Sequence, residues 1–114
     1  MLTLPYPPSA NAIWRNVNGR TLKSAAYRSW LAEAGWLVRE QRPPAVPGSY
    51  HLRILADRPD RRARDIDNLI KPVSDLLREA RVITDDSLAL SVSAAWSDAQ
   101  PKKPGAIHVH VEAI

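Results

Sequence analysis

Ten prolines divide this chain of 114 residues into short segments and limit where regular structure can form. Proline lacks a backbone N–H and has a fixed φ, so it is excluded from helix interiors and central strands. Pro7 and Pro8 end an alternating segment over residues 2–6, which is typical of a short edge strand. Residues 42–49, RPPAVPGS, form a loop too short and stiff to link two domains. We therefore expect one domain over residues 1–114.

Between the prolines, apolar residues follow two periodicities. They recur every three or four residues over 24–41, with Ser24 as N-cap, and again in a segment that begins near Asn68 or Leu69. Three other segments alternate between apolar and polar or small residues, as strands do, and the last two do so strictly. These segments are residues 50–57, 88–96 and 107–113. The pattern predicts an α+β fold, in which two helices cover one face of a small mixed sheet of about four strands.

The composition indicates an anionic partner. The chain has 16 basic and 12 acidic residues, a net charge of +4, and 12 of its basic residues are arginine. Such an excess is typical of proteins that bind nucleic acid. The absence of cysteine excludes disulfides, thiolate zinc sites and a cysteine nucleophile. With no apolar run of membrane-spanning length and no signal-peptide pattern, we expect a cytoplasmic protein without a membrane partner.

The acidic residues of segment 65–87, DIDNLIKPVSDLLREARVITDDS, include two tight pairs. Asp65 and Asp67 are two residues apart, which in extended backbone sends both carboxylates to the same side. Asp85 and Asp86 precede the next predicted strand. If that strand lies beside the preceding one, its start lies near Asp65, and three or four carboxylates meet at one site.

Such a site has the chemistry needed to hydrolyse a phosphodiester. Oxygen ligands without nearby histidine or cysteine favour Mg²⁺ or Mn²⁺. Lys71 lies one helical turn beyond Asp67, so its ammonium can reach the same place. Four arginines precede the acidic residues and are expected to contact phosphate. They are Arg58, Arg61, Arg62 and Arg64.

Simpler interpretations compete with this one. Asp67 could cap the helix and Asp85 could open a turn. Asp65 could pair with Arg64 or Arg62, and the arginines could form a solvated loop. A lone Asp-x-Asp is common, so its spacing alone does not decide between a metal site and these structural roles.

Histidine and tryptophan give weaker signals. His108 and His110 share one face of the last predicted strand and could bind zinc, although exposed strand histidines are more often plain surface. Three of the four tryptophans, including Trp36, fall at core or near-core positions. Trp14 follows Pro7-Pro8 in a predicted loop and is a candidate for stacking on a base.

The segment DIDNLIKPVSDLL followed by ITDDS resembles the signature of the RusA family of Holliday-junction resolvases. That signature comprises Asp-x-Asp-Asn, a lysine four residues after the second Asp, and a later Asp-Asp pair. The stretch LPYPPSANAIWRNVNGRTLKSAAYRSW is similar to the family's opening strand, Pro-Pro-Ser-x-Asn loop and first helix. The resemblance covers nearly the whole chain in the right order.

The resemblance implies roles for individual residues. Asp65, Asp67 and Asp86 are expected to coordinate Mg²⁺ or Mn²⁺, and Lys71 is expected to be catalytic. Asn68 belongs to the motif and is expected to face the nucleic acid. Asp85 belongs to it without an assigned role.

The resemblance also implies a homodimer that cuts two opposed strands of a four-way DNA junction. Many family members carry a lysine where this chain has Trp96, and Lys102 or Lys103 could replace that DNA contact. Two other classes remain open. A non-catalytic junction-binding protein would not need the acidic residues, and a nucleotide-sugar transferase, which also uses Asp-x-Asp, normally needs a much larger α/β domain.

Overall fold

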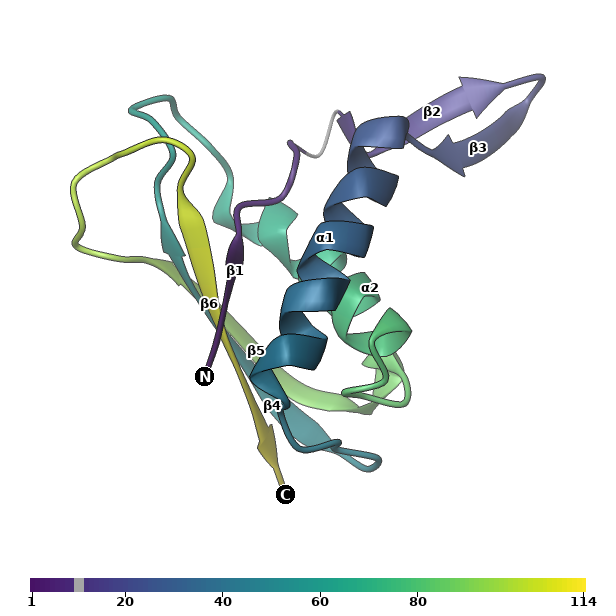
Figure 1. Ribbon diagram of the computed structural model, residues 1–114, viewed down its shortest axis with the longest axis vertical. Helices are drawn as coiled ribbons and strands as arrows, with labels where there is room; N and C mark the ends of the chain where they lie inside the picture. Colours follow the sequence, from purple (N-terminus) through teal and green to yellow (C-terminus); the bar gives the residue numbers. More distant parts are fainter. Residues whose placement is uncertain (10–11) are drawn as a thin grey trace.

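The computed structural model describes residues 1–9 and 12–114, which form a four-stranded sheet, a separate two-stranded ribbon and two helices (Figure 1). The elements are β1 (Leu2–Pro5), β2 (Trp14–Val17), β3 (Arg20–Lys23), α1 (Ala25–Gln41), β4 (Tyr50–Asp57), the 3₁₀ turn η2 (Ile66–Leu69), α2 (Ile70–Glu79), the 3₁₀ turn η3 (Asp86–Leu88), β5 (Ala89–Trp96) and β6 (Ala106–Ala113). Asn11 of the Pro-Pro-Ser-x-Asn loop lies outside the described residues. None of the helices described is long and apolar enough to cross a membrane.

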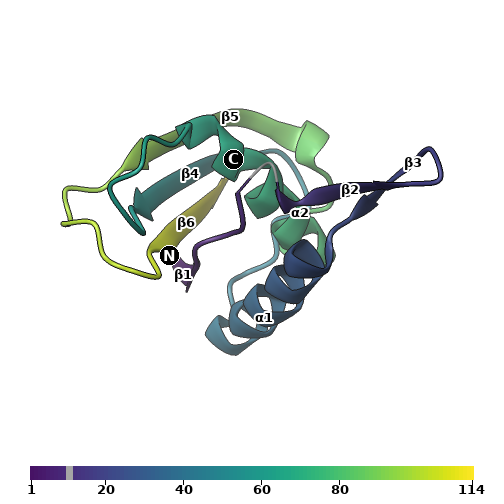
Figure 2. The same ribbon diagram turned by 90° about the horizontal axis from the view of Figure 1, so that it is seen from above.

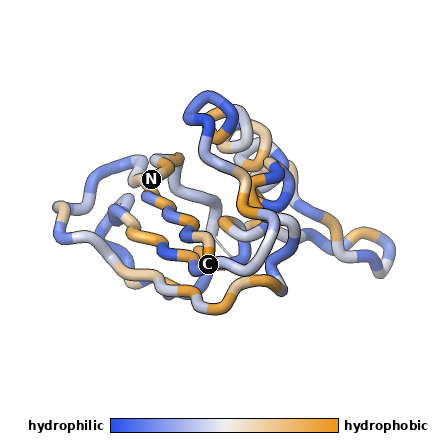
Figure 3. The backbone as a smooth tube through the Cα atoms, turned by 90° about the horizontal axis from the view of Figure 1, so that it is seen from below, coloured by the Kyte–Doolittle hydropathy of each residue, from blue (hydrophilic) through white to orange (hydrophobic). Residues whose placement is uncertain are grey.

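The sheet is mixed and has the order β1-β6-β4-β5. β6 pairs antiparallel with both β1 and β4, whereas β5 pairs parallel with β4. The predicted alternation is confirmed in β4, where Tyr50, Leu52, Ile54 and Ala56 are buried and the residues between them are not. The alternation along the strands is visible in Figure 3. The α+β prediction is therefore confirmed.

Both helices lie on the same side of the sheet (Figure 2). Ser24 caps α1 as predicted, because its Oγ accepts a hydrogen bond from the Tyr27 backbone N–H at 3.1 Å. Trp30 joins α1 to the end of β1, where its Nε1–H donates to the Pro5 carbonyl at 2.9 Å. The placement of Trp36 near the core was wrong, since its side chain is 60% exposed on the outer face of α1.

β5 is one of the two edge strands of the sheet, and unlike β1, the other edge strand, it leaves apolar side chains exposed. Val92 shares the core-facing side with Leu52, its partner in β4, yet it is 40% exposed. Leu90 falls at an irregularity in the register and is 61% exposed. The alternation of this segment thus predicts the strand correctly, but part of its apolar face stays uncovered in the structure.

The ribbon of β2 and β3 was not predicted. Its strands are joined by Asn18 and Gly19, with φ of 51° and 75°, as a two-residue type I′ turn requires. Trp14 therefore lies in a strand rather than in a loop, and its ring meets the Tyr27 ring edge-on at 5.9 Å. Figure 1 shows the ribbon projecting from the rest of the molecule.

Candidate functional site

The loop between β4 and η2 is organised around Asp60. Its carboxylate accepts from Arg64 Nη2 at 2.7 Å, from Arg64 Nε at 3.1 Å and from the Arg62 backbone N–H at 3.1 Å. These donors, chiefly the Arg64 guanidinium, lower the pKa of Asp60 to about 2. A two-point contact holds the guanidinium in one plane, so Arg64 is fixed where the loop meets η2.

Arg64 opens onto a pocket of about 270 Å³ between the segment after β1 and the start of η2. Its lining residues are Tyr6, Pro8, Ser9, Ala63, Arg64, Asp65, Asn68 and Leu69. Asp65 occupies the N-cap position of η2, yet its side chain makes no capping hydrogen bond. A carboxylate, an amide and a fixed guanidinium therefore share this pocket.

The structure does not show the ion pair that was considered for Asp65 or the helix cap that was considered for Asp67. Arg64 pairs with Asp60 instead of Asp65, and Asp67 caps neither η2 nor α2. Within residues 1–9 and 12–114, neither of these aspartates nor Asp86 forms an ion pair or a side-chain hydrogen bond. All three are exposed. No cationic side chain among the described residues pairs with any of these three carboxylates.

Asp85 has the structural role that was considered for it. Its Oδ2 accepts from the Ser87 backbone N–H at 3.0 Å and caps η3. The Ser87 hydroxyl also donates to this oxygen, and these bonds lower the Asp85 pKa. Its own carboxylate is thus already occupied, in contrast to that of neighbouring Asp86.

The expected meeting of three or four carboxylates is not found in the part of the chain that the structure describes, which holds no group of three acidic or histidine side chains able to bind a metal. The reason is the direction of β5. Because β4 and β5 are parallel, the start of β5 lies beside Tyr50, at the start of β4. Asp65 instead shares a pocket with Tyr6, just past the end of β1, which runs in the same direction as β4. The assignment of Asp65, Asp67 and Asp86 as ligands stays a prediction.

Lys71 contacts a buried acid that was not anticipated. Its Nζ lies 3.0 Å from Asp75 Oδ1, and the Asp75 side chain is only 2% exposed. The Tyr27 hydroxyl donates to Asp75 Oδ2 at 2.6 Å, and Arg78 lies 3.7 Å away. Burial, together with the bond to Asp75 and its negative charge, raises the Tyr27 pKa. Asp75 thus ties α1 to α2 and holds the Lys71 ammonium at the same time.

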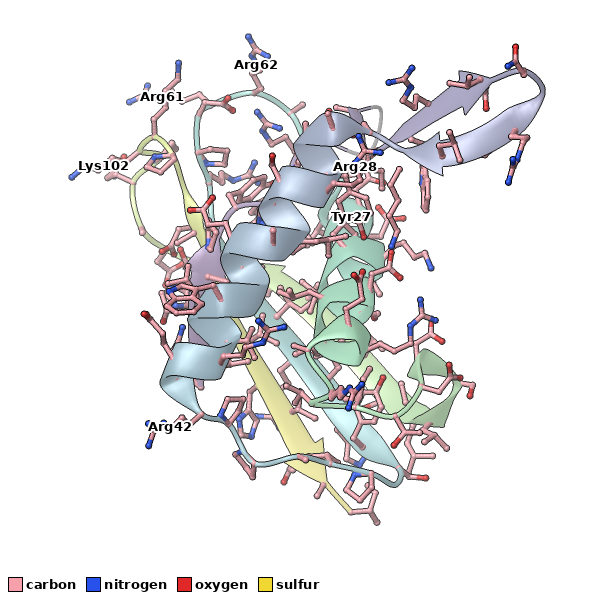
Figure 4. The ribbon with its side chains drawn as sticks, turned by 45° about the vertical axis from the view of Figure 1, so that its right-hand side comes forward. Tyr27, Arg28, Arg42, Arg61, Arg62 and Lys102 are labelled. Carbon is pink, nitrogen blue, oxygen red and sulfur yellow. The ribbon has the colours of Figure 1, made fainter. Side chains whose placement is uncertain are left out.

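The two loops at one end of the sheet bring most of the predicted basic residues together. The Lys102 backbone N–H donates to the Arg58 carbonyl at 3.0 Å, which joins the loop after β4 to the loop after β5. The guanidinium of Arg58 lies 4.2 Å from the centre of the Trp96 ring. Figure 4 shows Arg61, Arg62 and Lys102 extending outward at this end. Trp96, in place of a lysine, therefore supports an arginine.

Glycine is required where these loops approach each other. Gly105 has a φ of 77°, and a Cβ at this position would lie 2.9 Å from the Asp57 carbonyl oxygen. Both the backbone conformation and the close approach exclude a side chain. The position of the loop that carries Lys102 and Lys103 is thus fixed against the end of β4.

His108 takes part in a network on the open face of the sheet. Its Nε2 lies 3.0 Å from Asp57 Oδ2 and its Nδ1 lies 3.2 Å from Thr3 Oγ1, while the Ser97 hydroxyl donates to Asp57 Oδ1 at 2.5 Å. The Ser97 and His108 bonds lower the Asp57 pKa. Both ring nitrogens of His108 are engaged, so the interpretation as sheet surface holds and the zinc interpretation does not.

The pocket holds an exposed carboxylate, an amide and a fixed arginine, and the two loops at this end of the sheet carry further arginines and lysines, which suits a ligand that carries phosphate groups. The family model described as endodeoxyribonuclease RusA matches residues 5–112. The chain is 37% identical over 90 residues to the crossover junction endodeoxyribonuclease RusA of Aquifex aeolicus, covering 78% of this chain and 71% of that protein. It is 36% identical over 89 residues to the protein of the same name from Escherichia coli K12, covering 75% and 72%.

A phage protein gives a similar result. The chain is 32% identical over 84 residues to the crossover junction endodeoxyribonuclease of Enterobacteria phage HK97, covering 73% of this chain and 70% of that protein. The chain belongs to the RusA family of endodeoxyribonucleases.

Proposed function

We propose that this protein is a structure-selective endonuclease that resolves Holliday junctions in DNA recombination and repair. It cuts two opposed strands of a four-way junction, and residues 1–114 act as a single catalytic domain. The observation that carries the proposal is the pair of exposed, unpaired aspartates, Asp65 and Asp67, that directly follows a basic loop in a chain of net charge +4. The chain belongs to a family whose relatives are named crossover junction endodeoxyribonucleases, and this supports four-way junction DNA as the substrate.

We propose that Asp65 and Asp67 hold Mg²⁺ or Mn²⁺; the resemblance to the family adds as a ligand Asp86, which lies just before the start of β5 in this structure. The donor chemistry fits, because Mg²⁺ is commonly bound through one or two carboxylates together with waters and substrate phosphates rather than by a complete protein cage. Asp65 offers such a carboxylate inside the pocket, beside the Asn68 amide. A divalent cation bound there would polarise the scissile phosphate and lower the pKa of the attacking water.

Lys71 supplies a fixed positive charge. Its side chain is 52% exposed, and the contact with Asp75 uses only part of its donor capacity. The remaining N–H groups are free to meet a phosphate oxygen while negative charge develops on it. Because buried Asp75 already holds the ammonium, little reorganisation is needed during the reaction, which is the condition for strong electrostatic stabilisation of a transition state.

Binding of the junction is assigned to the basic loops and the pocket. Arginine suits this task, since its planar guanidinium makes two-point contacts with phosphate. These contacts hold the DNA in place without reading its sequence. The residues assigned to the DNA are Arg58, Arg61, Arg62, Arg64, Asn68, Lys102 and Lys103.

We also propose that the working form is a homodimer. A junction with near twofold symmetry presents two equivalent scissile phosphates, and a symmetric dimer presents two equivalent sites to them. One chain with one site would cut a single strand at a time.

The direct test uses a synthetic four-way junction with a mobile centre and a linear duplex of the same sequence. The wild-type protein with Mg²⁺ is expected to cut the junction and leave the duplex intact, and a chelator is expected to stop the reaction. A protein that binds the junction tightly but never cuts it would be the non-catalytic alternative. Cleavage in the presence of chelator would refute the metal assignment.

A further inference from the structure

The β2–β3 ribbon projects from the body of the molecule and is exposed at nearly every position (Figures 1 and 2). It is anchored only at its base. There the Ser24 backbone N–H donates to the Ile13 carbonyl at 2.9 Å, Trp14 meets Tyr27, and Lys23 lies 3.2 Å from Glu79. A two-stranded ribbon is marginal on its own, so an exposed ribbon of this kind adds little to the core.

The net charge of the chain is concentrated in and beside the β2–β3 ribbon. Residues 1–32 contain four basic residues and no acidic residue. The remaining 82 residues contain 12 basic and 12 acidic residues and carry no net charge. The four basic residues are Arg15, Arg20, Lys23 and Arg28. Three lie in the ribbon, and Arg28 lies in the first turn of α1 beside its base (Figure 4).

The two faces of the ribbon differ. Trp14 pairs across the ribbon with Lys23, and both side chains contact the Tyr27 ring in α1. Arg15 and Arg20 share the other face with their cross-strand partners Leu22 and Val17. Among the described residues, neither of these two arginines forms an ion pair. One face is thus used to attach the arm, and the other presents two free guanidinium groups.

We propose that the β2–β3 ribbon is a DNA-binding arm, which lies in a groove of one duplex arm of the junction with Arg15 and Arg20 against its phosphates. A two-stranded ribbon is narrow enough for the major groove. The inference rests on the proposed function, since it assigns a second contact surface to the same substrate. The basic loops and the ribbon extend from opposite sides of the segment that carries η2 (Figure 1), so together they can hold DNA on both sides of the pocket.

The first test compares two double variants of equal charge. Arg15→Gln/Arg20→Gln is expected to weaken junction binding on the order of tenfold or more and to reduce the slope of log K against log salt by about 2, because two phosphate contacts are lost. The control, Arg39→Gln/Arg42→Gln, removes the same charge from the far end of α1, where Figure 4 shows Arg42. It is expected to change the slope much less. Equal effects from both variants would overturn the proposal.

The second test distinguishes DNA from a second copy of the chain as the occupant. The chain has no cysteine, so Leu22→Cys introduces a single thiol on the arginine face, where a photoactivated crosslinker can be attached. Crosslinking to junction DNA is expected. Crosslinking only to another protein chain would overturn the proposal and assign the arm to the dimer interface.

The outcomes also separate the two proposals. A wild type that cuts junctions while the arm variant keeps full affinity and salt slope overturns the arm alone. A wild type that binds no junction overturns both.

Discussion

The bond between Tyr27 and Asp75 predicts a measurable stability difference between two tyrosine-to-phenylalanine variants. Tyr27 and Tyr50 are both fully buried, so Tyr27→Phe and Tyr50→Phe remove the same hydroxyl from equally enclosed rings. The Tyr27 hydroxyl donates to the Asp75 carboxylate at 2.6 Å, whereas the Tyr50 hydroxyl is buried without a partner in the described structure. The two substitutions should therefore differ in sign or size.

The magnitudes follow from what each hydroxyl contacts. A hydrogen bond to a charged group contributes roughly 1.5–3 kcal/mol, and Asp75 keeps Lys71 and Arg78 as partners after Tyr27→Phe. For a domain of this size the loss lowers Tm by on the order of 10 °C. Tyr50→Phe removes an unsatisfied polar group, which is expected to be neutral or stabilising by about 1 kcal/mol. Asp75→Ala should cost more than Tyr27→Phe, about 3–5 kcal/mol, because it breaks the whole buried cluster.

Thermal and urea unfolding of the three variants at pH 7 measure these differences. The expected order of stability is Tyr50→Phe at or above wild type, then Tyr27→Phe, then Asp75→Ala. Equal losses for the two tyrosine variants would refute the reasoning, because they would show that the Asp75 bond contributes nothing beyond ordinary packing.

The remaining predictions concern catalysis and pH. Asp67→Asn should abolish cleavage while junction binding, measured by gel shift, stays equal or tightens, because a negative charge near phosphate is removed; full cleavage would contradict its role. Lys71→Ala should lower the single-turnover rate on the order of 10²-fold at saturating Mg²⁺. It should lower the free energy of unfolding by only about 1 kcal/mol, because the Lys71 side chain is half exposed; wild-type cleavage rates would remove Lys71 from the mechanism. Asp60 has a depressed pKa of about 2, so its stabilisation is complete above about pH 4 and lost as pH falls toward 2. The Tm difference between wild type and Asp60→Asn should shrink over that range, and a constant difference would contradict the assigned contact with Arg64.

The sequence predicts those elements whose pattern has a single structural solution. Alternation over residues 50–57 requires a strand with one buried face, and β4 has these bounds. Ser24 before an apolar repeat predicts the start of α1, and the structure begins the helix at Ala25. Both predictions depend on local periodicity and capping, which do not require knowledge of tertiary neighbours.

The errors arise where a sequence pattern does not determine which segments lie next to each other in the fold. Alternation does not state strand direction, so it could not reveal that parallel pairing of β4 with β5 separates the start of β5 from Asp65. The buried role of Asp75 depends on Tyr27, which is 48 residues away. The ribbon did have a local signal, since Asn18-Gly19 is typical of a two-residue hairpin turn, but the flanking strands are too polar to show alternation.

The central claim is that paired, metal-dependent cuts are made at a four-way junction. A supercoiled plasmid with an extruded cruciform tests it most directly, since the first nick releases the supercoiling that maintains the cruciform. Two cuts made within one binding event yield linear plasmid, and successive independent cuts yield nicked circles. We predict that wild-type protein with Mg²⁺ gives mainly linear product, and that Asp67→Asn gives neither product. Nicked circles alone from the wild type, or linear product without a divalent metal, would contradict the account.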